Sequence, residues 1–157
     1  MNWGQADGIH YMLWWLMIKF TIHGKPIALK RHRVSKNGRM YDPSYKDKKQ
    51  IWLQIAQFKP KQPFVGDIML KVVFYMPRPK SHYRTGKRSH VLKAKAPVFH
   101  SVRPDIDNLI KMIADIIQGK DRMIIDDSQI CALSAIKVYS DDLDWNCLLY
   151  TSDAADE

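Results

Sequence analysis

The stretch RPDIDNLIKMIADIIQGKDRMIIDDSQI, which runs from Arg103 to Ile130, holds six aspartates in a chain whose formal net charge is +9. Apolar residues recur in it every three or four positions, at Ile106, Leu109, Ile110, Ile113, Ile116 and Ile117. This spacing places them on one face of a helix, so it predicts an amphipathic helix over about 106–117. Pro104 and Asp105 mark its start, and Gly119 follows where a glycine commonly ends a helix.

Two acids lie at the start of this helix. Helical residues two positions apart point about 200° from each other, so Asp105 and Asp107 converge only if Asp105 lies outside the helix, at its cap. The preceding proline favours that break. The alternative is structural: Asp105 is an ordinary N-cap and Asp107 an acid favoured by the helix dipole. The residues of this pair leave both interpretations open.

A second acidic pair, Asp126 and Asp127, precedes a strand expected over 129–139. Adjacent residues of an extended chain face opposite ways, so one of the two can point back at the helix start. An Asp-Asp-Ser turn is the alternative. Three converging carboxylates are costly unless a cation neutralises them, and Mg²⁺ prefers such oxygen ligands. The spacing therefore predicts a metal site.

The remaining charges of the stretch are interpreted individually. Lys111 lies one turn after Asp107 and could stabilise charge that develops on a phosphate. Asp115 lies one turn further on, where ordinary helix-surface pairing explains it, and Asp121 is also interpreted as a surface charge.

Charge is distributed unevenly along the chain. Residues 1–104 hold 21 Lys and Arg against 4 Asp, a net +17, whereas residues 105–157 hold 4 against 12 acids, a net −8. The basic part predicts a polyanionic partner, most simply nucleic acid, although a solvated lysine-rich surface is the alternative. A carboxylate-bound metal on a nucleic-acid-binding body indicates phosphodiester hydrolysis.

The other segments complete one domain of ordinary globular composition. Residues 17–23 alternate as a half-buried strand, and Asn37-Gly38 predicts a hairpin turn. Ser44 is a candidate N-cap for a helix whose lysines face outward, and residues 64–76 read as a core strand. Residues 76–100 form a long connection with seven Lys and Arg and no acid, which favours phosphate contact over a merely flexible loop. We expect an α+β fold, a single domain with a mixed β-sheet and two main helices.

Both ends of the chain differ from the rest. Residues 1–16 show no clear period and are predicted to be a non-native N-terminal extension, with a tryptophan-rich binding patch as the alternative. Residues 147–157, CLLYTSDAADE, resemble the translation of a transposon-type sequencing adapter and contain the only Glu of the chain. We predict that they are an adapter-derived, artefactual tail, which leaves 17–146 as a C-terminally truncated domain.

The compartment is predicted from what the sequence lacks. Its two cysteines form no zinc-ligand pattern and no disulfide framework. The longest apolar run, residues 11–20, is too short to span a bilayer, and no basic leader precedes it. We therefore expect a cytoplasmic protein without a membrane partner.

The motif RPDIDNLIK…DDSQI, together with the opening IKFTIHGKPIALKRHR and the segment FYMPRPKSH, resembles RusA-type Holliday junction resolvases. These crossover junction endodeoxyribonucleases act in DNA recombination and repair and are common in phages and prophages. The resemblance covers most of residues 17–140. It implies a RusA-like fold in a bacterial cytoplasm, with the gene carried by the host or by a phage.

The resemblance also implies an activity and a set of residues. A homodimer would resolve four-way or other branched DNA by paired phosphodiester hydrolysis, with Mg²⁺ as cofactor and Mn²⁺ as a substitute. Metal ligands would be Asp105, Asp107 and Asp127, and Lys111 would join them in catalysis. The role of Asp126 stays open, and His100 is as readily a hydrogen-bonding structural residue as a catalytic one. The expected DNA-binding residues are Lys30, Arg31, Arg33, Arg78, Lys80, Arg84, Lys87, Arg88, Lys93, Lys95 and Arg103.

Two other functions compete with this one. The first is a non-catalytic DNA-binding protein whose acidic cluster is structural. The second is a metal-dependent nuclease that prefers flaps or RNA.

Overall fold

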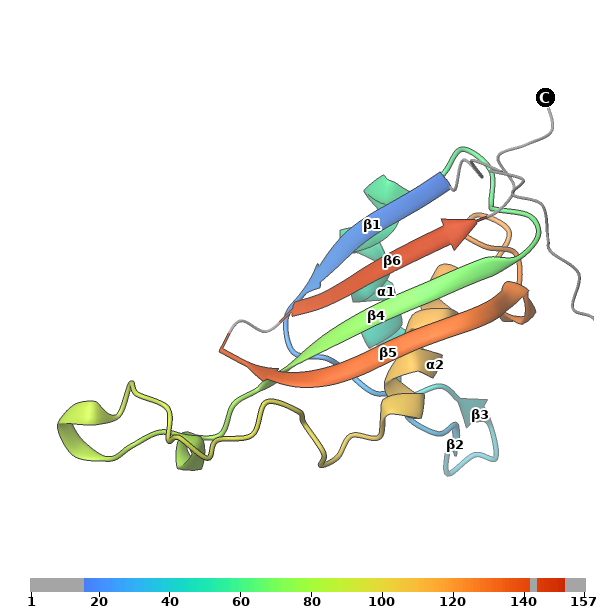
Figure 1. Ribbon diagram of the computed structural model, residues 1–157. Helices are drawn as coiled ribbons and strands as arrows, with labels where there is room; N and C mark the ends of the chain where they lie inside the picture. Colours follow the sequence, from blue (N-terminus) through green and yellow to red (C-terminus); the bar gives the residue numbers. More distant parts are fainter. Residues whose placement is uncertain (1–15, 142–143, 152–157) are drawn as a thin grey trace, which may run out of the picture.

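The computed structural model describes residues 16–141 and 144–151, and its centre is a four-stranded sheet. The strands lie side by side in the order β1 (Leu16–His23), β6 (Asp144–Thr151), β4 (Ile68–Pro77) and β5 (Ile130–Ser140). Strand β6 pairs antiparallel with both of its neighbours, whereas β4 and β5 are parallel. The sheet is therefore mixed, as expected (Figure 1).

Helices α1 (Tyr45–Ile55) and α2 (Ile106–Ile117) cover one face of this sheet (Figure 1). Strand β4 alternates between side chains buried under the helices and side chains that face away from them. The buried set is Ile68, Leu70, Val72, Phe74 and Met76. Two helices packed on a mixed sheet confirm the single-domain α+β fold. In the residues that the structure describes, no helix is both long and apolar enough to cross a membrane.

Helix α2 buries the apolar stripe that predicted it. Leu109, Ile113, Ile116 and Ile117 have at most 1% of their surface exposed. Burial of each such side chain stabilises the fold by about 1.5–3 kcal/mol, which explains why this helix could be predicted from spacing alone. The helix ends before Gly119. Its backbone φ of 134° is a conformation that residues with a Cβ atom rarely adopt.

The expected hairpin is present as β2 (Arg33–Val34) and β3 (Met40–Tyr41), paired antiparallel. Gly38 lies in its turn with φ 75°. Ser44 precedes α1 as predicted, but its hydroxyl makes no cap bond and instead accepts from the backbone N–H of Lys30 at 2.9 Å. The basic segment before the hairpin is therefore attached to the start of α1.

Residues 78–103, hereafter the arm, connect β4 with α2. They extend beyond the end of the sheet and then return along β5, where Phe99 pairs with Val138 (Figure 1). The arm contains two single-turn helices, η2 (Lys80–His82) and η3 (Gly86–Arg88). Its two sides are joined by backbone hydrogen bonds, from Arg84 N–H to Val91 O at 2.8 Å and from Lys93 N–H to His82 O at 2.9 Å. The long basic connection thus has internal structure of its own.

Two further short helices complete the elements, η1 (Ala56–Phe58) after α1 and η4 (Asp127–Gln129) before β5. Strand β6 includes residues 147–151, which belong to the predicted adapter-derived tail. Pairing shows where these residues lie and not where they originate, so their foreign origin stays a prediction. Residues 1–15 and 152–157 lie outside the described residues, as does most of the predicted N-terminal extension.

Candidate active site

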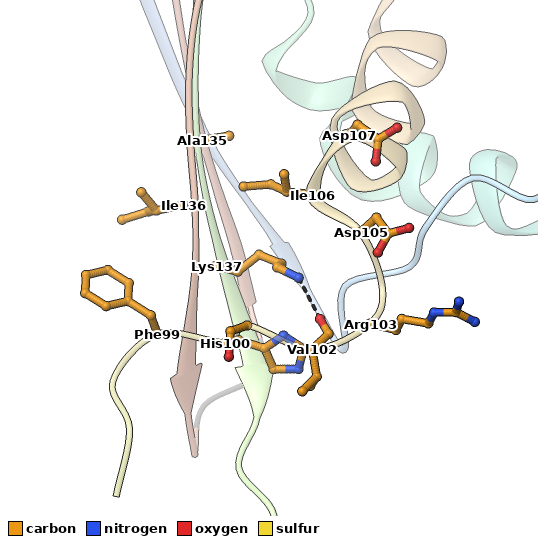
Figure 2. A pocket seen from close by; sticks show the side chains of 11 residues that line it. Phe99, His100, Val102, Arg103, Asp105, Ile106, Asp107, Ala135, Ile136 and Lys137 are labelled. Carbon is orange, nitrogen blue, oxygen red and sulfur yellow. Dashed lines mark hydrogen bonds between the residues drawn. The ribbon is translucent and has the colours of Figure 1, made fainter. Parts of the chain in front are cut away.

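Asp105 occupies the N-cap position of α2 in an extended conformation, with φ −70° and ψ 142°. Its side chain makes no capping hydrogen bond, so its carboxylate does not cap the N-terminus of the helix. Asp107 follows in the first turn. Figure 2 shows both carboxylates projecting from the helix start, away from strand β5. This is the break between cap and helix that convergence of the pair requires.

Two hollows share this carboxylate pair. The first, of about 870 Å³, lies between residues 99–107 and residues 135–137 of β5 and is hereafter the loop groove. The second, of about 390 Å³, lies between the start of α2 and residues 29–32 and is hereafter the basic groove. The basic groove is lined by Leu29, Lys30, Arg31, His32, Asp105, Asp107, Asn108 and Lys111. Acidic and basic side chains therefore share one cavity.

Lys111 lies on the same face as Asp107, with its Nζ 3.3 Å from Oδ2 of that carboxylate. Both side chains are about 60% exposed, at 61% and 60%. An exposed i,i+4 pair contributes only a few tenths of a kcal/mol, so a metal ion or a phosphate can readily displace it.

The basic segment is held in place by the helix. The backbone N–H of Leu29 donates to the carbonyl of Asn108 at 2.9 Å. Leu29, His32 and Asn108 were not predicted as site residues. Asn108 directly follows Asp107 and was available in the motif, whereas no periodicity connects Leu29 or His32 with the helix.

Asp127 does not join the other two aspartates within one chain. Its backbone N–H donates to Oε1 of Gln118 at 3.1 Å, at the C-terminal end of α2. A twelve-residue helix rises about 18 Å, so Asp127 is separated from Asp105 by nearly the length of α2. Strand β5 leads back towards the helix start, but the acidic pair precedes the strand and therefore stays at the far end.

Asp126 has a local structural role. Its side chain accepts from the backbone N–H of Ser128 at 3.0 Å, and Gln129 Oε1 accepts from the backbone N–H of Asp126 at 3.1 Å. Together these bonds form a capping box at the start of η4. Hydrogen bonds from Ser128 lower the pKa of Asp126 below its usual value. The turn interpretation of the Asp-Asp-Ser sequence therefore holds for this residue.

Among the described residues, no group of three His, Cys, Asp or Glu side chains lies close enough to hold a metal ion. The carboxylates of Asp105 and Asp107, which line one groove, nevertheless fit Mg²⁺. This ion binds through one or two carboxylates and retains several waters. Asp105 and Asp107 are the residues that would hold it.

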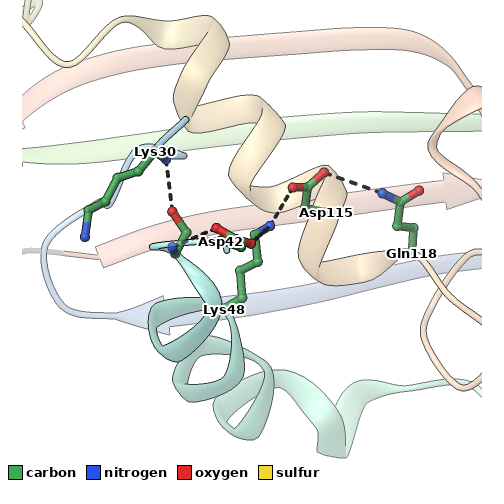
Figure 3. A network of polar contacts seen from close by, with 6 residues as sticks. Lys30, Asp42, Lys48, Asp115 and Gln118 are labelled. Carbon is green, nitrogen blue, oxygen red and sulfur yellow. Dashed lines mark hydrogen bonds and ion pairs between the residues drawn. The ribbon is translucent and has the colours of Figure 1, made fainter. Parts of the chain in front are cut away.

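Asp115 is not an ordinary surface charge. Its carboxylate lies 2.8 Å from Nζ of Lys48, which also contacts Asp42 at 2.7 Å (Figure 3). Lys48 is the exception to the expectation that the lysines of α1 face outward, because only 19% of its side chain is exposed. Burial alone would lower the pKa of Lys48, but its bonds to Asp115 and Asp42 raise it. This network joins α1 to α2 beneath the candidate site.

His100 lies behind the site with 7% of its surface exposed. Its backbone N–H donates to Lys137 O at 3.0 Å, and its ring packs 4.7 Å from that of Tyr139. Burial, and then the charge of Lys137, lower the pKa of His100. Among the described residues, its Nδ1 has no hydrogen-bond partner, and the imidazole lines the loop groove. The packing supports a structural role.

The predicted DNA-binding residues divide into two groups. Arg78 is occupied within the protein, because its guanidinium donates to Pro97 O and Tyr139 O and lies 5.4 Å from the Tyr139 ring. The exposed members are spread over the arm and the basic segment, and Arg103 lines the loop groove. Besides Arg103, the exposed arm residues are Lys80, Arg84, Lys87, Arg88, Lys93 and Lys95.

Comparison with known proteins places the chain in a family. The family model described as Endodeoxyribonuclease RusA matches residues 23–144, which include α2, both acidic pairs, the arm and the basic segment. An uncharacterized protein of Bacillus subtilis (strain 168), YqaN, is 32% identical over 130 residues, covering 80% of this chain and 89% of the relative. The chain therefore belongs to the RusA endodeoxyribonuclease family.

Proposed function

We propose that this protein is a Mg²⁺-dependent, structure-selective endonuclease that resolves Holliday junctions or other branched DNA by paired hydrolysis of phosphodiester bonds. The proposal rests on one observation: the carboxylates of Asp105 and Asp107 line a single groove with Lys111 and the basic segment 29–32. A phosphate drawn to the basic side of this groove meets the carboxylates on the other side.

The groove residues have distinct roles in this proposal. Asp105 and Asp107 bind Mg²⁺, with Mn²⁺ as a substitute, and the bound metal supplies Lewis-acid activation of the phosphate and of water. Lys111, beside Asp107, stabilises the negative charge that develops on the phosphate. Lys30 and Arg31 hold the neighbouring phosphates in register.

In this proposal, Asp127 of a second copy of the chain supplies the third carboxylate of the metal site. Strand β5 is an edge of the sheet, and its residues 130–136 (ICALSAI) contain none of the charged residues or prolines that commonly protect an edge. Leu133 and Ile136 are exposed there, at 50% and 44%. Antiparallel pairing of two such edges leads the start of one β5 towards the end of the other. Asp127 of the second copy would then approach Asp105.

The experiment uses the full chain on a synthetic four-way junction and on linear duplex of the same sequence. Nicking is measured with Mg²⁺, with EDTA and after Asp107→Asn. The matched control is Asp121→Asn, which removes an exposed carboxylate outside both grooves. We expect the wild type and the control to cut the junction in Mg²⁺ alone, and Asp107→Asn to bind the junction without cutting it.

The outcomes separate the competing functions. Binding without cleavage in Mg²⁺ or Mn²⁺ would support a non-catalytic DNA-binding protein. One observation favours this alternative: among the described residues of one chain, no third possible ligand joins Asp105 and Asp107. Equal cutting of junction and duplex would retain the nuclease and reject the resolvase. A preference for flaps or RNA would redirect the substrate assignment.

A further inference from the structure

Lys137 is a cation on the inner, helix-facing side of strand β5. It is in register with Phe74 of β4, whose side chain is fully buried, so the two side chains point to the same face of the sheet. Figure 2 shows Lys137 pointing towards the loop before α2, whereas Ile136 and Phe99 point the other way. A charged group facing the interior of a fold requires polar partners.

These partners are two backbone carbonyls. Lys137 Nζ donates to Val102 O at 2.8 Å and to Pro104 O at 2.6 Å. Bonds from an ammonium group to a carbonyl are charge-assisted and are stronger than neutral ones. No carboxylate among the described residues lies within ion-pair distance of Lys137, so its charge is committed to this loop.

The loop has few other attachments. Residues 101–103 and Asp105 are exposed, and Pro104 between them is half-buried. In the described part of the chain, the backbone–backbone bonds that border this loop are His100 N–H to Lys137 O and Leu109 N–H to Asp105 O. Between those two points, the ammonium of Lys137 connects the loop to the sheet.

We infer that Lys137 is a positioning residue for the candidate metal site, which it serves by holding the carbonyl of Pro104 and hence the backbone of Asp105. This inference rests on the proposed function, because it assigns Lys137 a purpose only if Asp105 binds a cation. Mg²⁺ requires oxygen ligands at about 2.0–2.1 Å in near-octahedral geometry, so a ligand on an untethered loop binds it less well. Removal of residues that orient a metal ligand typically weakens metal affinity or activity about 10- to 100-fold.

The test is Lys137→Met in the full chain, with Lys71→Met as the matched control. Lys71 is exposed on the opposite face of the sheet, on β4. Mg²⁺ binding is measured by titration calorimetry, and the Mg²⁺ concentration that half-saturates junction nicking is measured in parallel. We expect Lys137→Met to weaken Mg²⁺ binding by about 10- to 100-fold and to regain its rate at high Mg²⁺. Lys71→Met should match the wild type, and Lys137→Arg, which keeps a charged donor, should lie between the two.

Three results would overturn the inference or its basis. Unchanged Mg²⁺ affinity in a folded Lys137→Met variant removes Lys137 from the site while leaving the nuclease intact. A lower maximal rate that high Mg²⁺ does not restore points to direct contact with the substrate instead. Absence of Mg²⁺ binding in the wild type rejects the proposed function, and this inference with it. If Lys137→Met does not fold, Lys137→Gln undergoes the same titration.

Discussion

The backbone N–H of Asp127 donates to Oε1 of Gln118 at 3.1 Å, and this bond holds Asp127 at the end of α2 opposite to Asp105. Gln118 also lies within 3.5 Å of Asp115 through its Nε2, so the position of Asp127 is connected to the ion pair between α1 and α2. Among the described residues of one chain, no third carboxylate joins Asp105 and Asp107, so Asp127 can take part in the metal site only from another copy of the chain.

Mixing two inactive variants distinguishes these possibilities. Asp105→Asn and Asp127→Asn should each abolish junction nicking if both residues bind the metal. In a mixed dimer with shared sites, one site lacks both aspartates and the other retains both. We expect refolding the two variants together to restore single-strand nicking, measured on a gel with one labelled strand.

Restored nicking would be incompatible with a site built from one chain. If Asp127→Asn alone cuts at the wild-type rate, Asp127 is not a ligand, and a two-carboxylate site remains. Mixing Asp105→Asn with Asp107→Asn is the control and should restore nothing, because both residues lie on the same chain.

Lys48 should contribute strongly to stability. Its side chain is 19% exposed and lies between Asp42 and Asp115, so Lys48→Met leaves two carboxylates close together without their cation. Because these side chains are partly exposed, removal of the cation costs less than in a fully buried pair, about 1.5–3 kcal/mol. We expect the free energy of unfolding, measured by urea denaturation at pH 7, to fall by about this amount.

Lys49→Met is the matched control, because Lys49 is an exposed neighbour on the same helix. Its unfolding free energy should remain within about 0.5 kcal/mol of the wild type. Equal effects of the two substitutions would mean that the network in Figure 3 contributes little stability.

The arm should contribute to DNA affinity by neutralising phosphates. Replacing Arg84, Lys87 and Arg88 with Gln should weaken junction binding in EDTA. The slope of log K against log salt should decrease in magnitude by about 0.9 for each phosphate that the variant no longer neutralises. Gel-shift titrations between low and high salt measure this slope.

The control is the double variant Lys59→Gln, Lys61→Gln, which removes two exposed lysines that follow α1. An unchanged slope in the arm variant would exclude the arm from the DNA interface.

Stability should depend on the protonation of His100. Burial lowers the pKa of its imidazole in the folded state, so the unfolded chain binds a proton more readily. The stability contributed by neutral His100 is therefore fully present above its unfolded pKa of about 6.5 and is lost as the pH falls towards the folded value. We expect the melting temperature to fall between pH 7.5 and pH 5, and to fall less in His100→Asn. An identical decrease in both proteins would remove His100 as the cause.

Local patterns in the sequence determined the helix start, the hairpin and the core strand. The apolar stripe of α2, the turn at Gly38 and the alternation along β4 are each set by the preferences and burial of neighbouring residues, so spacing alone predicts them. The break at Asp105 also follows locally, because the preceding proline and the apolar stripe together place it at the cap.

Tertiary structure decided which distant residues meet. Adjacent acids before a strand predict that one of them reaches the helix start, but the chain needs the length of β5 to return there, so Asp126 caps a turn and Asp127 stays beyond α2. Lys48 and Lys137 are ordinary basic residues in the sequence, yet one joins two helices and the other holds the loop before Asp105. The sequence determined which residues could do chemistry. Their partners depended on packing, because contacts between residues far apart in the chain leave no periodic signal within it.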